Sequence, residues 1–163
     1  MILNDSTVNN ITFDEEAEQG VLVRSDKFKI TSEKNIEAKA KGDNNIIYLA
    51  NGKDATIENK GNITIKKSGG IDNDQIKMVG MMGIAGAKLI GTGSKIESDE
   101  VHSIGVAGIG ANGATDKTNV TLTNATVSMT APKSVAIYNE HSKSTVTDST
   151  INTSGYNSIS VYN

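Results

Sequence analysis

The sequence predicts an all-β fold, a right-handed parallel β-helix (solenoid) of about six coils with about 24 to 32 residues per coil. The main observation is an internal repeat, in which residues 121–130 align with residues 145–154. The same shift aligns residues 134–139 with residues 158–163. A fixed period of this size, carried by short β-rich segments, is typical of a solenoid in which each coil buries its apolar face against its neighbours.

The repeat continues towards the N-terminus with a slightly longer shift. Residues 79–84 match residues 104–109, and residues 20–22 match residues 45–47. A second family of segments lies between these. Each member has β-branched residues, a polar turn and another apolar residue, so each predicts a strand, a bend and a second strand. These segments cover residues 30–36, 56–65, 89–96, 120–127 and 146–151.

Within the second family the apolar residues recur at every second position, which is the period of a β-strand and not of a helix. Residues 62–66 and 119–123 show this alternation. We therefore expect one side of each strand to face the interior of the solenoid, with Val127 among the inward residues. The only proline is Pro132, so the sheets lose almost no backbone donors to proline.

The composition favours a narrow core over a large globular one. Hydrophobic residues make up 36% of the chain, aromatic residues make up 4%, and tryptophan is absent. Two longer connections interrupt the period, at residues 66–75 and 110–118. Insertions in solenoids form surface loops, so these two segments are either recognition loops or insertions without a role.

Charge and cysteine content exclude several classes of function. The formal net charge is −3 without a basic stripe, so we expect no nucleic-acid partner. The absence of cysteine excludes thiol catalysis and zinc sites built on cysteine. The most apolar run, residues 76–91, contains Lys77 and Lys88, so we expect no membrane span. Both ends fall within the repeat pattern, so we expect a fragment of a longer protein whose uncapped ends can self-associate.

Acidic residues are the main candidates for catalysis. Polysaccharide lyases and hydrolases built on β-helices need two or three carboxylates in one cleft. Glu97, Asp99 and Glu100 lie close together, and strand alternation places Glu97 and Asp99 on one face. Asp72 and Asp74 lie in a loop that can approach them. The alternative is that these acids keep strand ends soluble and discourage edge pairing. We assign no catalytic residue and expect no enzyme activity.

Other polar residues give weaker signals for a metal or substrate site. His102 and His141 lie one or two coils apart, so we expect two separate, exposed side chains. Arg24 is the only arginine, which argues against a lyase that holds uronate carboxylates with arginine. The acidic cluster at residues 14–18 is typical of a solvated turn. Residues 69–72 resemble the calcium-binding Gly-Gly-x-Gly-x-Asp repeat only in part and only once, so we expect no metal or cofactor.

Three tyrosines occupy similar places beside apolar segments, and asparagines lie near them. An aligned tyrosine column is either a structural stack or a sugar-binding strip, and the pattern favours the structural stack. Asparagines at matched positions predict an internal ladder that satisfies the backbone at each corner. The tyrosines are Tyr48, Tyr138 and Tyr162, and the asparagines are Asn51, Asn139 and Asn163.

The repeats also resemble those of a known family. Residues 119–129, 134–139 and 144–152 are similar to the passenger repeats of large type V autotransporter adhesins of Gram-negative bacteria. They are also similar in style to the repeats of filamentous haemagglutinin-like proteins. The likeness extends over nearly the whole chain and consists of style and period, without a diagnostic catalytic motif.

The resemblance implies a β-helix displayed at the bacterial cell surface, outside the cell. Its partner would be a receptor or glycan on host cells or on other bacteria, and its role would be attachment, virulence or biofilm formation. The segment would either bind directly or act as a rigid stalk that displays a binding site. The signal peptide and membrane barrel of the parent protein would lie outside this chain. A carbohydrate-active β-helix enzyme is the main alternative.

Overall fold

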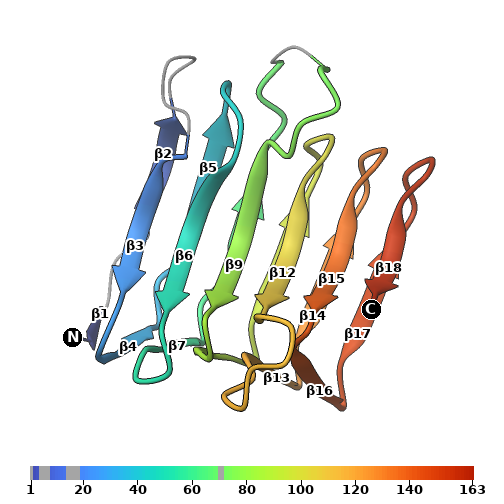
Figure 1. Cartoon of the computed structure of the whole chain (residues 1–163). Helices are drawn as coiled ribbons and strands as arrows, with labels where there is room; N and C mark the ends of the chain where they lie inside the picture. Colours follow the sequence, from blue (N-terminus) through green and yellow to red (C-terminus); the bar gives the residue numbers. More distant parts are fainter. Residues whose placement is uncertain (1, 4–7, 14–18, 70–71) are drawn as a thin grey trace.

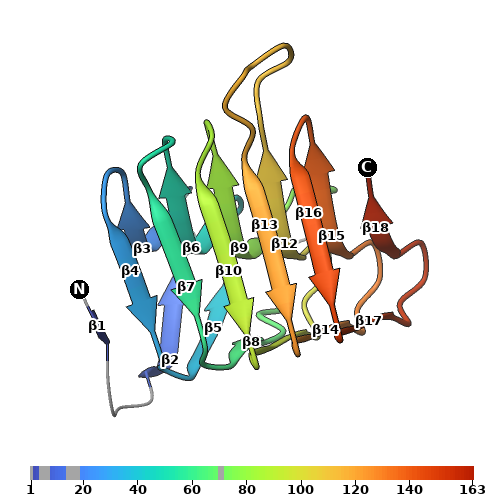
Figure 2. The same ribbon diagram turned by 90° about the horizontal axis from the view of Figure 1, so that it is seen from below.

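The computed structural model describes residues 2–3, 8–13, 19–69 and 72–163, and these form 18 β-strands in three parallel sheets (Figures 1 and 2). Each coil contributes one strand to each sheet. Sheet A contains β1 (Ile2–Leu3), β4 (Lys29–Ser32), β7 (Thr56–Asn59), β10 (Lys88–Thr92), β13 (Asn119–Thr123) and β16 (Lys143–Thr147). Sheet B contains β2 (Val8–Phe13), β5 (Ile36–Ala40), β8 (Ile63–Ile65), β11 (Lys95–Ser98), β14 (Thr126–Met129) and β17 (Thr150–Thr153). Sheet C contains β3 (Val21–Ser25), β6 (Asn45–Asn51), β9 (Met78–Ile84), β12 (Ile104–Ile109), β15 (Val135–Glu140) and β18 (Ile159–Tyr162).

The chain winds through these sheets as a solenoid of about five turns, close to the six coils expected. In Figure 1 it runs down sheet C at the front, backwards through sheet A below and up sheet B at the rear, while it advances from left to right. Figure 2, seen from below, shows the same advance from β4 to β16. This path is right-handed, the hand that twisted parallel strands favour. The predicted fold class is therefore confirmed.

The sequence repeats correspond to strands paired in register. Thr121 pairs with Thr145, which the alignment of residues 121–130 with 145–154 predicted. Ile104 pairs with Val79, in agreement with the alignment of residues 79–84 with 104–109. The two longer connections lengthen their coils without disturbing the pairing, because β10 stays in register with both β7 and β13. The segments predicted as strand, bend and strand also form the paired strands of sheets A and B.

Side chains from all three sheets meet in one narrow core of Ile, Leu, Val, Met, Ala and one Tyr. Val127 is completely buried and lies in register between Ile96 and Ile151 of the adjacent coils. The predicted inward phase of this strand is therefore confirmed. The acidic cluster predicted to be a solvated turn, residues 14–18, lies outside the described residues.

Sheet C bends at one position in each coil. Gly80 and Gly105 occupy this position in successive strands, where a Cβ would lie 2.6 and 2.7 Å from a backbone carbonyl oxygen of the next coil. Glycine permits this close approach because it has no Cβ. At the bend two successive residues are buried inside, as Ile47 and Tyr48 show in β6. The outward residues on either side of the bend are consequently three positions apart.

Candidate functional site

The outer surface of sheet C carries two columns of side chains, one on each side of the bend. Each strand contributes one residue to each column, and only one of the twelve positions holds a charged residue. We call these columns the apolar face. The first column is Val21, Ile46, Val79, Ile104, Val135 and Ile159, and the second is Arg24, Leu49, Met82, Ala107, Tyr138 and Tyr162.

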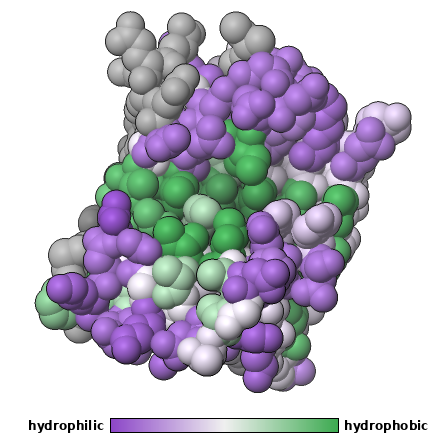
Figure 3. Space-filling model, viewed as in Figure 1, coloured by the Kyte–Doolittle hydropathy of each residue, from purple (hydrophilic) through white to green (hydrophobic). Residues whose placement is uncertain are grey.

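The middle of the apolar face forms a hydrophobic cluster that is separate from the interior core. Val79, Ile104 and Ala107 are buried in this cluster, and Met82 and Tyr138 are among the half-buried residues that pack against them. Figure 3 shows the cluster as a green band between hydrophilic rims. A contiguous apolar patch on the outside of a protein is typical of an interaction site.

The outward columns of sheets A and B are polar among the described residues except at Ile90, although these sheets have the same parallel geometry. The apolar face is therefore not a general consequence of the fold, because a solvated solenoid surface needs no second apolar side. A column of sheet A consists of Lys29, Thr56, Lys88, Asn119 and Lys143. A column of sheet B consists of Glu37, Thr64, Glu97, Ser128 and Asn152.

The apolar face is hollowed over β3, β6 and β9, where a pocket has a volume of about 400 Å³. Leu49, Met82 and Arg24 are among the residues that line it. Ile76, from the connection that precedes β9, also lines the pocket and is 39% exposed. The pocket thus combines sheet residues with one apolar residue of the neighbouring loop.

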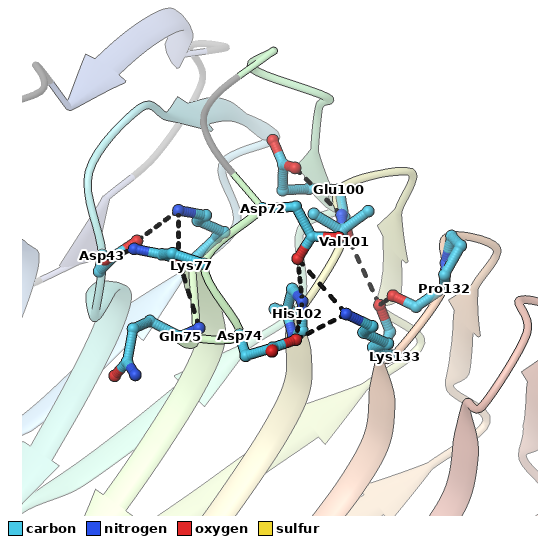
Figure 4. A network of polar contacts seen from close by, with 12 residues as sticks. Asp43, Asp72, Asp74, Gln75, Lys77, Glu100, Val101, His102, Pro132 and Lys133 are labelled. Atoms are coloured by element: carbon cyan, nitrogen blue, oxygen red, sulfur yellow. Dashed lines mark hydrogen bonds and ion pairs between the residues drawn. The ribbon is translucent and has the colours of Figure 1, made fainter.

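The connection between β8 and β9, which contains the predicted loop 66–75, is anchored to the bend after β11. The backbone N–H of Lys67 donates to Asp99 at 2.6 Å, and that of Ser68 donates to Glu100 at 2.5 Å. Glu100 is buried and also accepts a bond from the backbone N–H of Val101. Figure 4 shows Glu100 beside this loop. The carboxylate of Glu100 therefore holds the backbone of the loop.

Further along, the same loop binds side chains of the next two coils (Figure 4). Nε2 of His102 donates to Asp72 at 2.6 Å, and Nζ of Lys133 lies 2.6 Å from Asp74. The His102 hydrogen bond and the charge of Lys133 lower the pKa of Asp72. The His102 side chain is only 10% exposed, so the expectation of an exposed His102 is wrong. Its partner Asp72 lies 30 residues away, in a loop that the local sequence pattern does not connect to it.

Asp72, Asp74 and His102 bring three metal-ligating atoms within 4.8 Å of one another. Such a cluster has ligand types that suit a divalent cation. Lys133 lies between the two carboxylates, however, with Nζ 3.5 Å from Asp72 and 2.6 Å from Asp74. The ammonium group supplies the positive charge that these carboxylates need, and the cluster serves as a link between coils.

A buried lysine ties the other end of the loop to an earlier coil. Nζ of Lys77 donates to Asp43 at 2.5 Å and to Asn73 at 3.0 Å, and the Lys77 side chain is 2% exposed. Burial by itself would raise the pKa of Asp43, but the hydrogen bonds from Lys77 and Asn73 together lower it. Burial makes this pair costly to break, because either partner alone would be an uncompensated charge.

Glu97 and Asp99 share a face, as strand alternation predicted, and both line a shallow depression on sheet B of about 170 Å³. Their carboxylates already have partners. Nζ of Lys95 lies 2.7 Å from Glu97, and Asp99 accepts the loop bond described above. Asp72 and Asp74 interact with His102 and Lys133, so the loop acids and the sheet acids have different partners.

The three tyrosines do not form one column. Tyr48 is completely buried, and its hydroxyl lies 2.6 Å from Ser32 inside the core. Tyr138 and Tyr162 lie outside and stack with their ring centroids 4.9 Å apart and their planes at 2°. Tyr48 pairs with Met81 and not with the outward residue of that strand, because the two positions lie on opposite sides of sheet C. The predicted structural stack is thus limited to the two C-terminal tyrosines.

Asparagines bridge adjacent coils at the corner between sheets A and B. The backbone N–H of Asn62 donates to Asn35 at 2.8 Å, and that of Lys95 donates to Asn62 at 3.1 Å. Asn139, which the pattern assigns to a ladder, accepts bonds from Ser142 of the following turn and from Ser144 of β16. His141 is exposed, in agreement with the prediction.

The second longer connection, residues 110–118, is fixed at its end by a buried threonine. The hydroxyl of Thr118 donates to the carbonyl of Ile109 at 2.7 Å and accepts from the backbone N–H of Gly86 at 3.0 Å. Its middle, including Asn112 and Gly113, is exposed. This connection lies at the ends of the sheet C strands opposite to the loop that contains Asp72 (Figure 1).

The sequence reasoning missed the apolar face, although a signal for it exists. Residues 46–50, 79–84 and 104–109 are nearly continuous apolar or glycine runs, whereas strands of sheets A and B alternate between apolar and polar residues. A strand whose two sides are both apolar has a continuous run of apolar residues in its sequence. The contrast between the two families of segments could have identified sheet C as the sheet with an apolar exterior.

Comparison of the chain with protein-family models, curated proteins and solved structures finds no match in any of the three. In the part of the chain that the structure describes, no helix is long and apolar enough to cross a membrane.

Proposed function

We propose that this chain is a segment of a bacterial cell-surface adhesin that attaches to a receptor or glycan through the apolar face of sheet C. The observation that carries the proposal is the contrast between the three sheets, because among the described residues a continuous apolar exterior is present on sheet C alone. A second support is the resemblance of the repeats to those of autotransporter adhesins.

The physical reason is the favourable free energy of covering exposed apolar surface, about 25 cal/mol per Å². The parallel ladders and the continuous core hold the two columns at fixed spacing, so a partner meets a surface that needs no rearrangement. Attachment through a preformed face is the role that a rigid solenoid suits best.

The test is saturable binding of the labelled chain to host cells, bacterial cells and isolated glycans, with two matched variants. Met82→Glu places a charge on the apolar face, whereas Ile90→Glu places one on the outer side of sheet A. Both residues are half-buried, outward and apolar. We expect Met82→Glu to abolish binding and Ile90→Glu to preserve it. Equal binding by both variants, or no binding by the parent chain, contradicts the proposal.

A carbohydrate-active enzyme is the second candidate, and the shared depression of Glu97 and Asp99 favours it. One carboxylate would act as general acid and the other as base or nucleophile. Shortening of the glycans during the same experiment, lost in Glu97→Gln, would support this function. Intact glycans would contradict it.

A further inference from the structure

We infer that the partner presents an amphipathic α-helix, which lies on the apolar face with its axis across the sheet C strands. The inference rests on the proposed function, because it names the chemistry that the same face recognises. It follows from the dimensions of the face, from its lack of free polar groups and from its rims.

The dimensions of the face match those of a short helix. Its two columns are three residues apart along each strand, which is about 10 Å at 3.3 Å per residue. Six strands span five steps of about 4.8 Å, so the face is about 24 Å long. An α-helix is about 10 Å wide and rises 1.5 Å per residue, so about 16 residues would cover the face.

The apolar face offers few hydrogen-bonding groups, so it favours a ligand whose own polar groups are already paired. The first column consists only of Val and Ile, and the backbone of sheet C is paired in parallel ladders. A helix pairs its own backbone groups except at its ends. An extended peptide or a glycan would leave polar groups unpaired against the apolar face, at a cost of about 1–3 kcal/mol each.

The second column is shaped to receive side chains and not flat sugar rings. Tyr138 and Tyr162 stack on each other along the solenoid axis, so they present ring edges to a ligand on the face. The hydroxyl of Tyr138 donates to Glu140 at 3.0 Å. A sugar needs an exposed aromatic face for stacking, whereas the apolar stripe of a helix can pack against ring edges.

The rims of the face are hydrophilic, and one of them adds an apolar residue to the pocket. Ile76, from the connection that precedes β9, adds to the apolar lining of the pocket. Its loop is held in place by the Lys77–Asp43 pair and by the link between Asp72 and His102. Figure 3 shows hydrophilic surface above and below the apolar band. Apolar residues of a helix at i, i+3, i+4 and i+7 would face the band, and its polar side would face solvent between the rims.

The test is selection of peptides from a displayed library of random sequences, each long enough to form a helix that spans the face. The library is first depleted on the Met82→Glu variant and then selected on the parent chain. The inference predicts enriched peptides with apolar residues spaced three and four apart. Synthetic copies that contain tryptophan report binding by their own fluorescence, because the chain has no tryptophan. Their helical circular dichroism is also distinct from the signal of the all-β chain.

We expect Met82→Glu to weaken binding of the selected peptides at least tenfold and Ile90→Glu to change it less than twofold. Enriched peptides with an alternating apolar pattern, peptides without helical signal when bound, or no enrichment would overturn the helix inference. If cells still bind in a manner that depends on Met82, the proposed function survives that result. Attachment of cells that is independent of Met82 contradicts the proposed function whatever the peptides show.

Discussion

Replacement of Val127 by aspartate is the sharpest test of the core. Val127 lies in β14, is completely buried and pairs with Ile96 and Ile151 of the adjacent coils. Its Cγ1 also lies against Gly105 of sheet C, so close that a Cβ there would be 2.6 Å away. The substituted carboxylate would therefore face the middle of the core, at the point where sheets B and C meet.

The expected loss of stability has two parts. Removing a fully buried valine side chain costs about 1.5–3 kcal/mol. Burying a polar group without a partner costs about 1–3 kcal/mol more. We expect a total of about 4 kcal/mol, a large fraction of the stability of an ordinary domain. With a urea slope of about 2 kcal/mol per M, the unfolding midpoint falls by about 2 M.

The assay is urea unfolding followed by far-UV circular dichroism, with Thr126→Asp as the matched control. Thr126 lies in the same strand, points outward and pairs with Lys95 and Thr150. We expect this control to unfold within about 0.5 kcal/mol of the parent chain. A Val127→Asp variant that unfolds like the control would refute the inward phase of β14.

Three further predictions concern other parts of the solenoid. Gly105→Ala should lower the free energy of unfolding by about 1–3 kcal/mol in urea titrations, because the new Cβ meets a backbone carbonyl of the next coil. Unchanged stability would show that the backbones of the two coils do not approach each other closely at Gly105. Tyr48→Phe should cost about 1–2 kcal/mol by calorimetry, because it removes the buried hydrogen bond between the Tyr48 and Ser32 hydroxyls. A neutral result would contradict that bond. The pKa of Asp72 is lowered in the folded chain. The stabilisation from its contact with His102 should therefore be fully present above the ordinary carboxyl pKa near 4, and it should be lost as the pH falls through the lower pKa that Asp72 has in the folded chain. Hydrogen exchange of the loop should then accelerate at acid pH before the core opens, and simultaneous opening would contradict this order.

The architecture could be predicted because strands that pair in register in a solenoid recur at a fixed spacing in the sequence. Residues 121–130 and 145–154 differ by one coil, and identical spacing places their apolar residues in the same column. The bend in sheet C was harder to predict, because it changes the usual alternation by one residue. This is why Tyr48 and Tyr138, which lie beside similar apolar segments, are on opposite sides of the sheet.

The loop contacts could not be predicted from local patterns. Asp72 and His102 are 30 residues apart, and Asp74 and Lys133 are 59 residues apart. These separations correspond to about one and two coils, but the residues lie in connections that are not paired as strands, so the repeat by itself does not predict their contacts. Only the three-dimensional path of the loop brings these charges together, and the same path carries Ile76 to the pocket.

The most direct test of the central claim is methionine oxidation of the chain bound to cells, read by mass spectrometry. Met82 is half-buried on the apolar face, whereas its neighbour Met81 is completely buried in the core and serves as an internal reference. Oxidation of an accessible thioether reports its exposure to solvent. We predict that attachment to cells protects Met82, while Met81 stays unreactive in both the free and the attached chain. Saturable attachment with Met82 as reactive as in the free chain would contradict the assignment of the apolar face as the binding surface.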